Sequence, residues 1–331
     1  MPSRLAPPVP DDFVLARDAC SYGYFLLRPN HWDPKRRVLS RVLHLSGGPA
    51  TLRISQEGDP DADGAPAAWP QVAGNQLRIS VDRTLARGER AEAIAQVTRM
   101  LRLDEPASTL AAFHTLDPRW AATGRGRLFR SPTMFEDVIK TVTSCNVQWP
   151  STITMNRRLC EVVGVGGAFP TAAKLARTRP ATLRARCRCG YRDQRIVDLA
   201  RLFAPRGKRP PEADAPWFED PGTSDEAVWE ALLALPGIGP YAAANILQLL
   251  GRFGRLPLDT ESVRHGRSVL GFEGSHKAVM KRVGEHFEPF GGHKFRSYWF
   301  ELWAFYEAKR GRADSWDRET VGATFTASQL E

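Results

Sequence analysis

The spacing of apolar residues changes near residue 88 and divides the chain into two parts. Before that point the apolar runs are short, and apolar and polar residues alternate in Val42-Leu43-His44-Leu45 and Leu52-Arg53-Ile54. Such alternation is typical of antiparallel strands with one buried face. Strands are expected at 24–27, 38–45, 51–54 and 77–81. The pattern predicts a small antiparallel β domain over residues 13–87, with a mobile Gly/Pro-rich loop at 58–74.

From Gly88 onward the apolar positions recur at helical spacing. Helices are expected at 89–103, 106–115, 134–145, 151–163, 171–177, 193–203, 225–235, 240–250, 260–269, 275–286 and 294–309. The fold class is therefore α+β, with the sheet domain ahead of an all-α core over residues 88–311. Residues 1–12 are expected to be a flexible N-terminus, and residues 312–331 a polar, loose tail.

Charge and cysteine content narrow the class of protein. The 331 residues carry a net charge of +9, which favours polyanionic partners. The Pro-rich N-terminus has no apolar core of a signal peptide, and no apolar run is long enough to span a membrane. The five cysteines are odd in number and irregularly spaced, so a disulfide framework is not expected. A reduced, cytoplasmic protein without a metal site or cofactor is expected.

The segment with the clearest chemistry is Leu235-Pro236-Gly237-Ile238-Gly239-Pro240-Tyr241. Pro236 and Gly237 end one helix, and Pro240 is favourable at the start of the next. Gly239 lets the backbone approach a partner without a side chain in the way. Free amides at the start of the second helix form an anion site that suits a phosphate. The alternative is an ordinary helix-turn-helix packing corner.

This segment resembles the turn of the helix-hairpin-helix (HhH-GPD) DNA glycosylase superfamily, with the hairpin spanning 225–251. Three further segments resemble the same superfamily: Ser131 to Gln148, Cys189 to Ile196 and Phe295 to Trp303. A sheet domain ahead of a helical core is similar to the 3-methyladenine (alkyladenine) and 8-oxoguanine glycosylase branches. The resemblance implies a helical core of two lobes with the active-site cleft between them. Because no cysteine follows Cys189, the iron–sulfur cluster of some members is not expected.

The resemblance also implies the catalytic group. A carboxylate follows the second hairpin helix in these enzymes, and Arg255-Leu256-Pro257-Leu258-Asp259 places Asp259 there. A carboxylate beneath the deoxyribose stabilises the positive charge that develops as the N-glycosidic bond breaks. Asp259 also stands where a residue would cap the next helix, which is compatible with catalysis. Members that cleave the strand carry a Lys where this chain has Tyr241, and a phenol cannot form an imine.

Further site residues are expected from the resemblance. The expected DNA contacts are Gly237, Gly239, Tyr241, Asn146, Gln148, Arg192 and Arg264, with a wedge at 146–149. The expected base-pocket residues are Tyr22, Tyr24, Trp149, Asn245, Trp299 and Trp303. An Arg that the oxoguanine branch uses to read the opposite cytosine is replaced by Ser151, and a common His after the catalytic Asp is replaced by Glu261.

The sequence therefore predicts a monomeric, monofunctional DNA glycosylase of base excision repair. Its partner is double-stranded DNA containing a damaged base, which is flipped out of the stack. An alkylated purine is the expected target, since electron-poor bases stack well on aromatic rings. Two alternatives stay open. One is a glycosylase for oxidised or deaminated bases, and the other is a non-enzymatic DNA-damage-binding protein.

Overall fold

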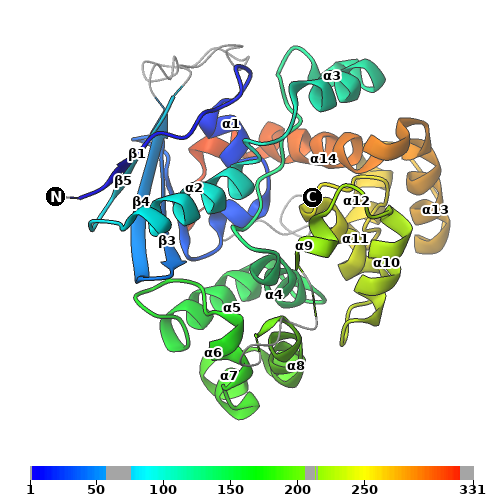
Figure 1. Cartoon of the computed structure of the whole chain (residues 1–331). Coiled ribbons are helices and arrows are strands. Elements are labelled where there is room, and N and C mark those ends of the chain that lie inside the picture. Colours follow the sequence, from blue (N-terminus) through cyan, green and yellow to red (C-terminus); the bar gives the residue numbers. More distant parts are fainter. Residues whose placement is uncertain (1, 57–75, 206–212, 214, 321–331) are drawn as a thin grey trace.

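A five-stranded antiparallel sheet forms one side of the molecule (Figure 1). The computed structural model describes residues 2–56, 76–205, 213 and 215–320. The strand order is β1-β5-β4-β3-β2, and every neighbouring pair is antiparallel. The strands are β1 (Arg4–Leu5), β2 (Asn30–Asp33), β3 (Val38–Leu45), β4 (Gly48–Gln56) and β5 (Leu77–Val81).

The alternation of apolar and polar residues along the strands gives the sheet one buried face and one solvent face. Leu39 and Leu43 of β3, Ile54 of β4 and Ile79 of β5 are buried. The residues that alternate with them, such as Ser40, Arg53 and Arg78, are wholly or partly exposed. Side chains of successive strand residues point to opposite faces, so one face joins the core and the other meets solvent. The predicted strands at 38–45, 51–54 and 77–81 are confirmed.

The N-terminal part differs from its prediction in two places. The strand expected at 24–27 is wrong: Gly23–Leu26 forms a 3₁₀ turn, η1, whose residues are all buried. A short, wholly apolar run carries no periodicity that distinguishes a strand from a buried turn. The stretch 1–12, expected to be flexible, contains β1, whose residues pair with Ser80 and Ile79 of β5.

Outside the sheet, the regular elements of the described residues are helices, which confirms the α+β class. Among the described residues no helix is long and apolar enough to cross a membrane. The α-helices are α1 (Leu15–Ala19), α2 (Arg87–Leu101), α3 (Ala107–Leu116), α4 (Met134–Ser144), α5 (Trp149–Val162), α6 (Ala172–Ala176), α7 (Pro180–Cys187), α8 (Asp193–Phe203), α9 (Ala215–Glu219), α10 (Asp225–Ala234), α11 (Pro240–Leu249), α12 (Thr260–Ser268), α13 (His276–Phe287) and α14 (Lys294–Arg310). The further 3₁₀ segments are η2 (Pro118–Trp120), η3 (Gly190–Arg192), η4 (Glu288–His293) and η5 (Ala313–Ser315).

Two hydrophobic clusters organise these elements. The sheet cluster joins the inner face of the sheet to α2, α12, α13 and α14. The helical cluster is built from α4 to α11. In Figure 1 the helices α4 to α8 (green) lie in the lower part of the molecule, and α10 to α13 (yellow to orange) lie on the side opposite the sheet. The last helices of the chain therefore share one hydrophobic cluster with the first strands.

The segment after α14 also packs into the sheet cluster. Trp316 is 1% exposed and its ring lies 5.3 Å from that of Trp303. Arg318 is buried and donates to the carbonyl oxygen of Leu26. Residues 312–320, expected to be loose, are therefore held in place. The predicted loop at 58–74 and the end of the tail lie outside the described residues.

A buried charged triad joins the sheet to the helical cluster. Glu136 of α4 accepts from Arg41 of β3 at 2.5 Å, and the Lys140 ammonium lies 2.7 Å from its other oxygen. The three side chains are at most 4% exposed. Burial raises the pKa of Glu136, but Arg41 and Lys140 outweigh it and the net pKa is lowered. Glu136 is therefore ionised and compensates two buried cations.

Candidate active site

A cavity of about 380 Å³ opens between the sheet cluster and the hairpin. It is lined by residues from five separate stretches of the chain, so only the folded molecule assembles it. The lining residues are Tyr22, Gly23, Tyr24, Ser144, Val147, Gln148, Trp149, Thr152, Tyr241, Asn245, Pro257, Asp259, Thr260, Glu261, Tyr298, Trp299, Leu302 and Tyr306. The expected catalytic carboxylate and five of the six expected base-pocket residues are among them.

Asp259 stands at the N-terminus of α12, where its carboxylate caps the helix. Its Oδ1 accepts from the backbone amides of Glu261 at 2.9 Å and Ser262 at 3.2 Å, and the Ser262 hydroxyl accepts from the Asp259 amide. This is a reciprocal capping box. The cap fixes the carboxylate at the wall of the cavity.

The groups around Asp259 shift its pKa in opposite directions. Burial raises its pKa above the ordinary value of 3.8, and the neighbouring charge of Glu261 raises it further. The Ser262 amide and the Tyr241 phenol, which is hydrogen-bonded to the carboxylate, lower the pKa. Burial dominates, so the net pKa of Asp259 is raised. A perturbed carboxylate at the wall of a cavity is typical of catalytic sites.

Tyr241 lies on the first turn of α11, between Asp259 and the sheet cluster. It is half-buried, and its backbone carbonyl accepts from the Asn245 amide at 3.1 Å. Burial raises the pKa of the phenol, and Asp259 raises it further, so Tyr241 stays protonated at neutral pH. A protonated phenol donates a hydrogen bond but offers no amine.

Aromatic rings form one wall of the cavity. Tyr22 packs against Tyr24 and Trp299, with ring centroids 4.8 Å and 4.7 Å apart. Trp299 is fixed by its indole nitrogen, which donates to the Ser21 carbonyl oxygen at 2.8 Å. Trp149, at the start of α5, contributes a further ring. Tyr298, a further candidate ring on the last helix, also lines the cavity from α14, as does Tyr306, which sequence reasoning did not select.

Trp303 does not line the cavity, contrary to expectation. It is 2% exposed and lies within the sheet cluster, stacked on Trp299 with ring centroids 5.2 Å apart. Residues four apart on a helix share a face, so the helical pattern could not distinguish Trp299, which reaches the cavity, from Trp303, which does not.

Glu261 is held at the cavity by two neighbours. Its Oε1 accepts from the Arg264 guanidinium and from the Tyr306 hydroxyl. Arg264 is buried and its guanidinium lies 4.3 Å from the centroid of the Phe305 ring. In this structure the Arg264 guanidinium is therefore paired with Glu261 inside the protein, and its contact with a DNA phosphate stays a prediction.

A second, larger hollow of about 880 Å³ adjoins the cavity and shares Tyr241, Asp259, Val147 and Gln148 with it. The hairpin borders this groove. Gly237 has a φ of +71°, so it supplies the left-handed turn, and nothing lies within 4 Å of a side chain added at Gly239. The backbone at Gly239 is thus open to a partner, as predicted.

The segment between α4 and α5 also lines the groove. Asn146 and Gln148 are exposed, and Asn146 has a left-handed φ of 53°. Arg192 is 4% exposed and donates to the carbonyl oxygens of Val142, Cys145 and Asn146. Arg192 therefore holds the segment in place from inside the protein. Its guanidinium is buried, which differs from the expected position in contact with DNA.

Arg195 is a groove residue that sequence reasoning missed. It lines the groove, and its side chain occupies the space where Gly237 has no Cβ; an added Cβ would lie 1.8 Å from its Nε. The signal available was its place three residues after Arg192, in the first turn of α8.

The comparisons place this fold among known structures. No family model and no curated protein matches the sequence. The structure is similar to the 3-methyladenine DNA glycosylase from Archaeoglobus fulgidus, at 17% identity over 90% of this chain and 98% of that chain, with a TM-score of 0.61. It is also similar to the Clostridium acetobutylicum 8-oxoguanine glycosylase/lyase in complex with double-stranded DNA containing cytosine opposite 8-oxoguanine, at 16% identity over 94% and 98%, with a TM-score of 0.61.

A third similar structure is MBOgg1 in complex with a low-affinity DNA ligand, at 17% identity over 90% of this chain and 94% of that chain, with a TM-score of 0.62. All three similarities span at least 90% of this chain. The chain therefore has the fold of the helix-hairpin-helix DNA glycosylases, to which its hairpin sequence is similar.

Proposed function

We propose that this protein is a monofunctional DNA glycosylase that releases an alkylated purine from double-stranded DNA. The observation that carries the proposal is the position of Asp259, which borders both the aromatic cavity and the groove beside the hairpin. A base inside the cavity, with its backbone at the hairpin, has its sugar next to this carboxylate. The carboxylate then stabilises the oxocarbenium-like sugar as the base departs.

The chemistry of the cavity favours a positively charged or electron-poor base. Among the described residues that line it there is no Lys, Arg or His, although the chain carries a net charge of +9. Its wall combines the rings of Tyr22, Trp149 and Trp299 with the carboxylate of Asp259, while the charge of Glu261 is already balanced by Arg264. Rings and carboxylates both attract a cation. N-alkylated purines carry such a charge, whereas 8-oxoguanine and uracil are neutral.

Base release from a panel of duplexes tests this proposal. The panel contains a methylated purine, hypoxanthine, uracil and 8-oxoguanine in the same sequence. A desolvated cation–π contact is worth about 2 kcal/mol, so we expect the methylated purine to be released roughly thirtyfold faster than a neutral base. Faster release of 8-oxoguanine would reassign the enzyme to oxidised bases, and no release of any base would leave only a DNA-binding role.

A borohydride trap tests the absence of strand cleavage. Because the phenol of Tyr241 cannot form an imine, we expect no covalent adduct when the wild type meets an abasic duplex and borohydride. Tyr241→Lys places an amine beside Asp259, and this variant is expected to give a trapped adduct on the same duplex. Tyr241→Phe serves as the control without an amine. An adduct from the wild type would contradict the proposal.

The acidity of Asp259 predicts the pH profile. Its raised pKa means that the carboxylate becomes protonated at a pH above its ordinary value of 3.8. Below that raised pKa, kcat is expected to fall about tenfold for each pH unit. The Tyr241 hydrogen bond lowers this pKa, so Tyr241→Phe is expected to move the acid limb to higher pH. An acid limb that stays in place would show that the phenol does not act on Asp259.

A further inference from the structure

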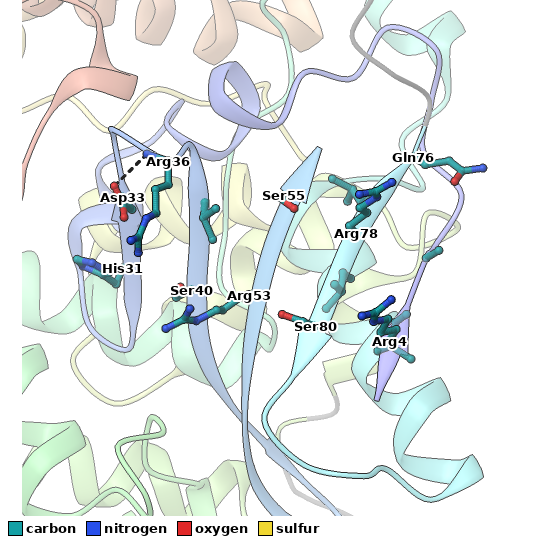
Figure 2. Close-up of a pocket in the computed structure, with 15 residues that line it drawn as sticks. Arg4, His31, Asp33, Arg36, Ser40, Arg53, Ser55, Gln76, Arg78 and Ser80 are labelled. Atoms are coloured by element: carbon teal, nitrogen blue, oxygen red, sulfur yellow. Dashed lines mark hydrogen bonds between the residues drawn. The ribbon is translucent and has the colours of Figure 1, made fainter. Parts of the chain in front are cut away.

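The solvent face of the sheet carries a second feature, a hollow of about 830 Å³ (Figure 2). The strand register aligns one row of its residues across all five strands. Arg4 of β1 lies opposite Ser80 of β5, Ser80 opposite Arg53 of β4, Arg53 opposite Ser40 of β3, and Ser40 opposite His31 of β2. Strands are about 4.8 Å apart, so this row extends for roughly 19 Å. Arginines and serines alternate along it, and His31 ends the row.

The hollow is strongly basic. Arg4, Arg36, Arg53 and Arg78 line it and are exposed. Asp33 is the one carboxylate among its described lining residues, and its Oδ1 accepts from the backbone amides of Lys35 and Arg36. The described lining thus holds four arginines and a single acid. Hydroxyl and guanidinium donors together are the groups that contact phosphate oxygens in protein–DNA complexes.

The lining also indicates which nucleic acid fits. Proteins that hold single strands stack the bases on aromatic side chains. Among the described residues lining this hollow there is no Phe, Tyr or Trp. Contacts here would go to phosphates alone, which is how proteins hold a duplex without reading its sequence. The backbone of double-stranded DNA is therefore the partner whose charge and chemistry match.

This face is separate from the active site. Its lining residues are absent from both the cavity and the groove beside the hairpin. The opposite face of the sheet packs into the sheet cluster, which also contains Tyr22 and Trp299 of the cavity wall. The outer face therefore points away from the cavity. A duplex seated at the hairpin does not cover it.

We propose that the outer face of the sheet, centred on Arg4 and Arg53, is a second binding site for duplex DNA. One protein molecule then holds two duplex segments at once, one at the hairpin and one on the sheet. Such an arrangement allows transfer from one DNA segment to another during the search for damage. The proposal rests on the proposed function only for the duplex at the hairpin.

A bridging assay tests the second site. A duplex is fixed to beads, the protein is bound, and capture of a labelled, undamaged duplex is measured from low to high salt. The sheet variant is Arg4→Gln with Arg53→Gln. The control is Arg87→Gln with Arg177→Gln, which removes the same charge from exposed arginines outside all three hollows. Base release is measured for every variant on a short duplex.

The wild type and the control are expected to capture the second duplex. The sheet variant is expected to lose most of this capture, and the slope of log K against log salt is expected to become shallower by about 2, since each lost phosphate contact contributes about one unit. Its base release should equal that of the wild type. If the wild type captures the second duplex but releases no base, the proposed function is refuted and the second binding site is not.

Two results would overturn the second site. One is equal capture by the sheet variant and the control, which would assign bridging to net charge or to two protein copies. The other is capture that appears only when Glu57, Asp59, Asp61 and Asp63 are neutralised. These four acids follow β4 directly in the sequence, and that outcome would make the chain's own acidic segment the occupant.

Discussion

Replacement of Asp259 by Asn is expected to lower base release by about 10² to 10³-fold while leaving duplex affinity unchanged. Loss of one preorganised electrostatic group at a reacting centre has a cost of this size. Asn removes the negative charge that would face the developing cation. It is also one of the best helix caps, so it can still accept from the amides of Glu261 and Ser262. Single-turnover release and duplex binding measure the two effects.

Asp259→Ala is the matched control, because it removes both the charge and the cap. Its free energy of unfolding is expected to fall by about 1 kcal/mol, whereas that of Asp259→Asn should stay near the wild-type value. Comparison of the two variants separates catalysis from helix capping. Base release by Asp259→Asn at the wild-type rate would refute the catalytic assignment, since the fold would be intact.

Replacement of Glu136 by Gln is expected to lower the free energy of unfolding by about 3 to 5 kcal/mol. Glu136 is the carboxylate between Arg41 and Lys140, and all three side chains are buried. Without it two cations stay in the interior with no opposite charge beside them, and this is the costly way to break a buried ion pair. Denaturant unfolding followed by circular dichroism measures the change.

Glu161→Gln provides the surface control for this prediction. Glu161 pairs with Arg157 at 3.1 Å on α5, and the two side chains are 54% and 44% exposed. Exposed pairs of this kind are worth about 0.5 kcal/mol or less. Equal changes for Glu136→Gln and Glu161→Gln would mean that water or relaxation compensates the buried cations.

Most of the helices and strands could be predicted from segments in which apolar residues recur with a regular period. The amphipathic pattern at 134–145 and 193–203 corresponds to α4 and α8; α8 has one buried face, whereas α4 is buried along nearly its whole length. Where the pattern is weak, prediction fails. The helix α7 was missed because Leu183 is almost its only large apolar residue, and its packing comes from tertiary contacts with α5 and α8. Local sequence does not contain those contacts.

The candidate site could be predicted to the level of segments and not of side-chain partners. The hairpin and Asp259 follow a local pattern, and the structure brings them to one groove. The roles of Arg264 and Arg192 depend on which acceptors lie beside them, namely Glu261 and the carbonyl oxygens of the segment after α4. An arginine that neutralises a buried acceptor and one that awaits a phosphate have the same sequence signature.

The walls of the cavity come from different clusters, and this has a consequence for how the protein could diversify. The rings of Tyr22, Trp149 and Trp299 belong to the sheet cluster, whereas Val147 and the start of α11 belong to the helical cluster. The Tyr22 hydroxyl donates to Asn245 of α11 at 3.4 Å and links the two walls, whereas the Trp299 indole is anchored to Ser21 on the sheet side. Under the proposed function, substitution of Trp299 is therefore a route to a changed base preference that leaves the duplex-binding part in place.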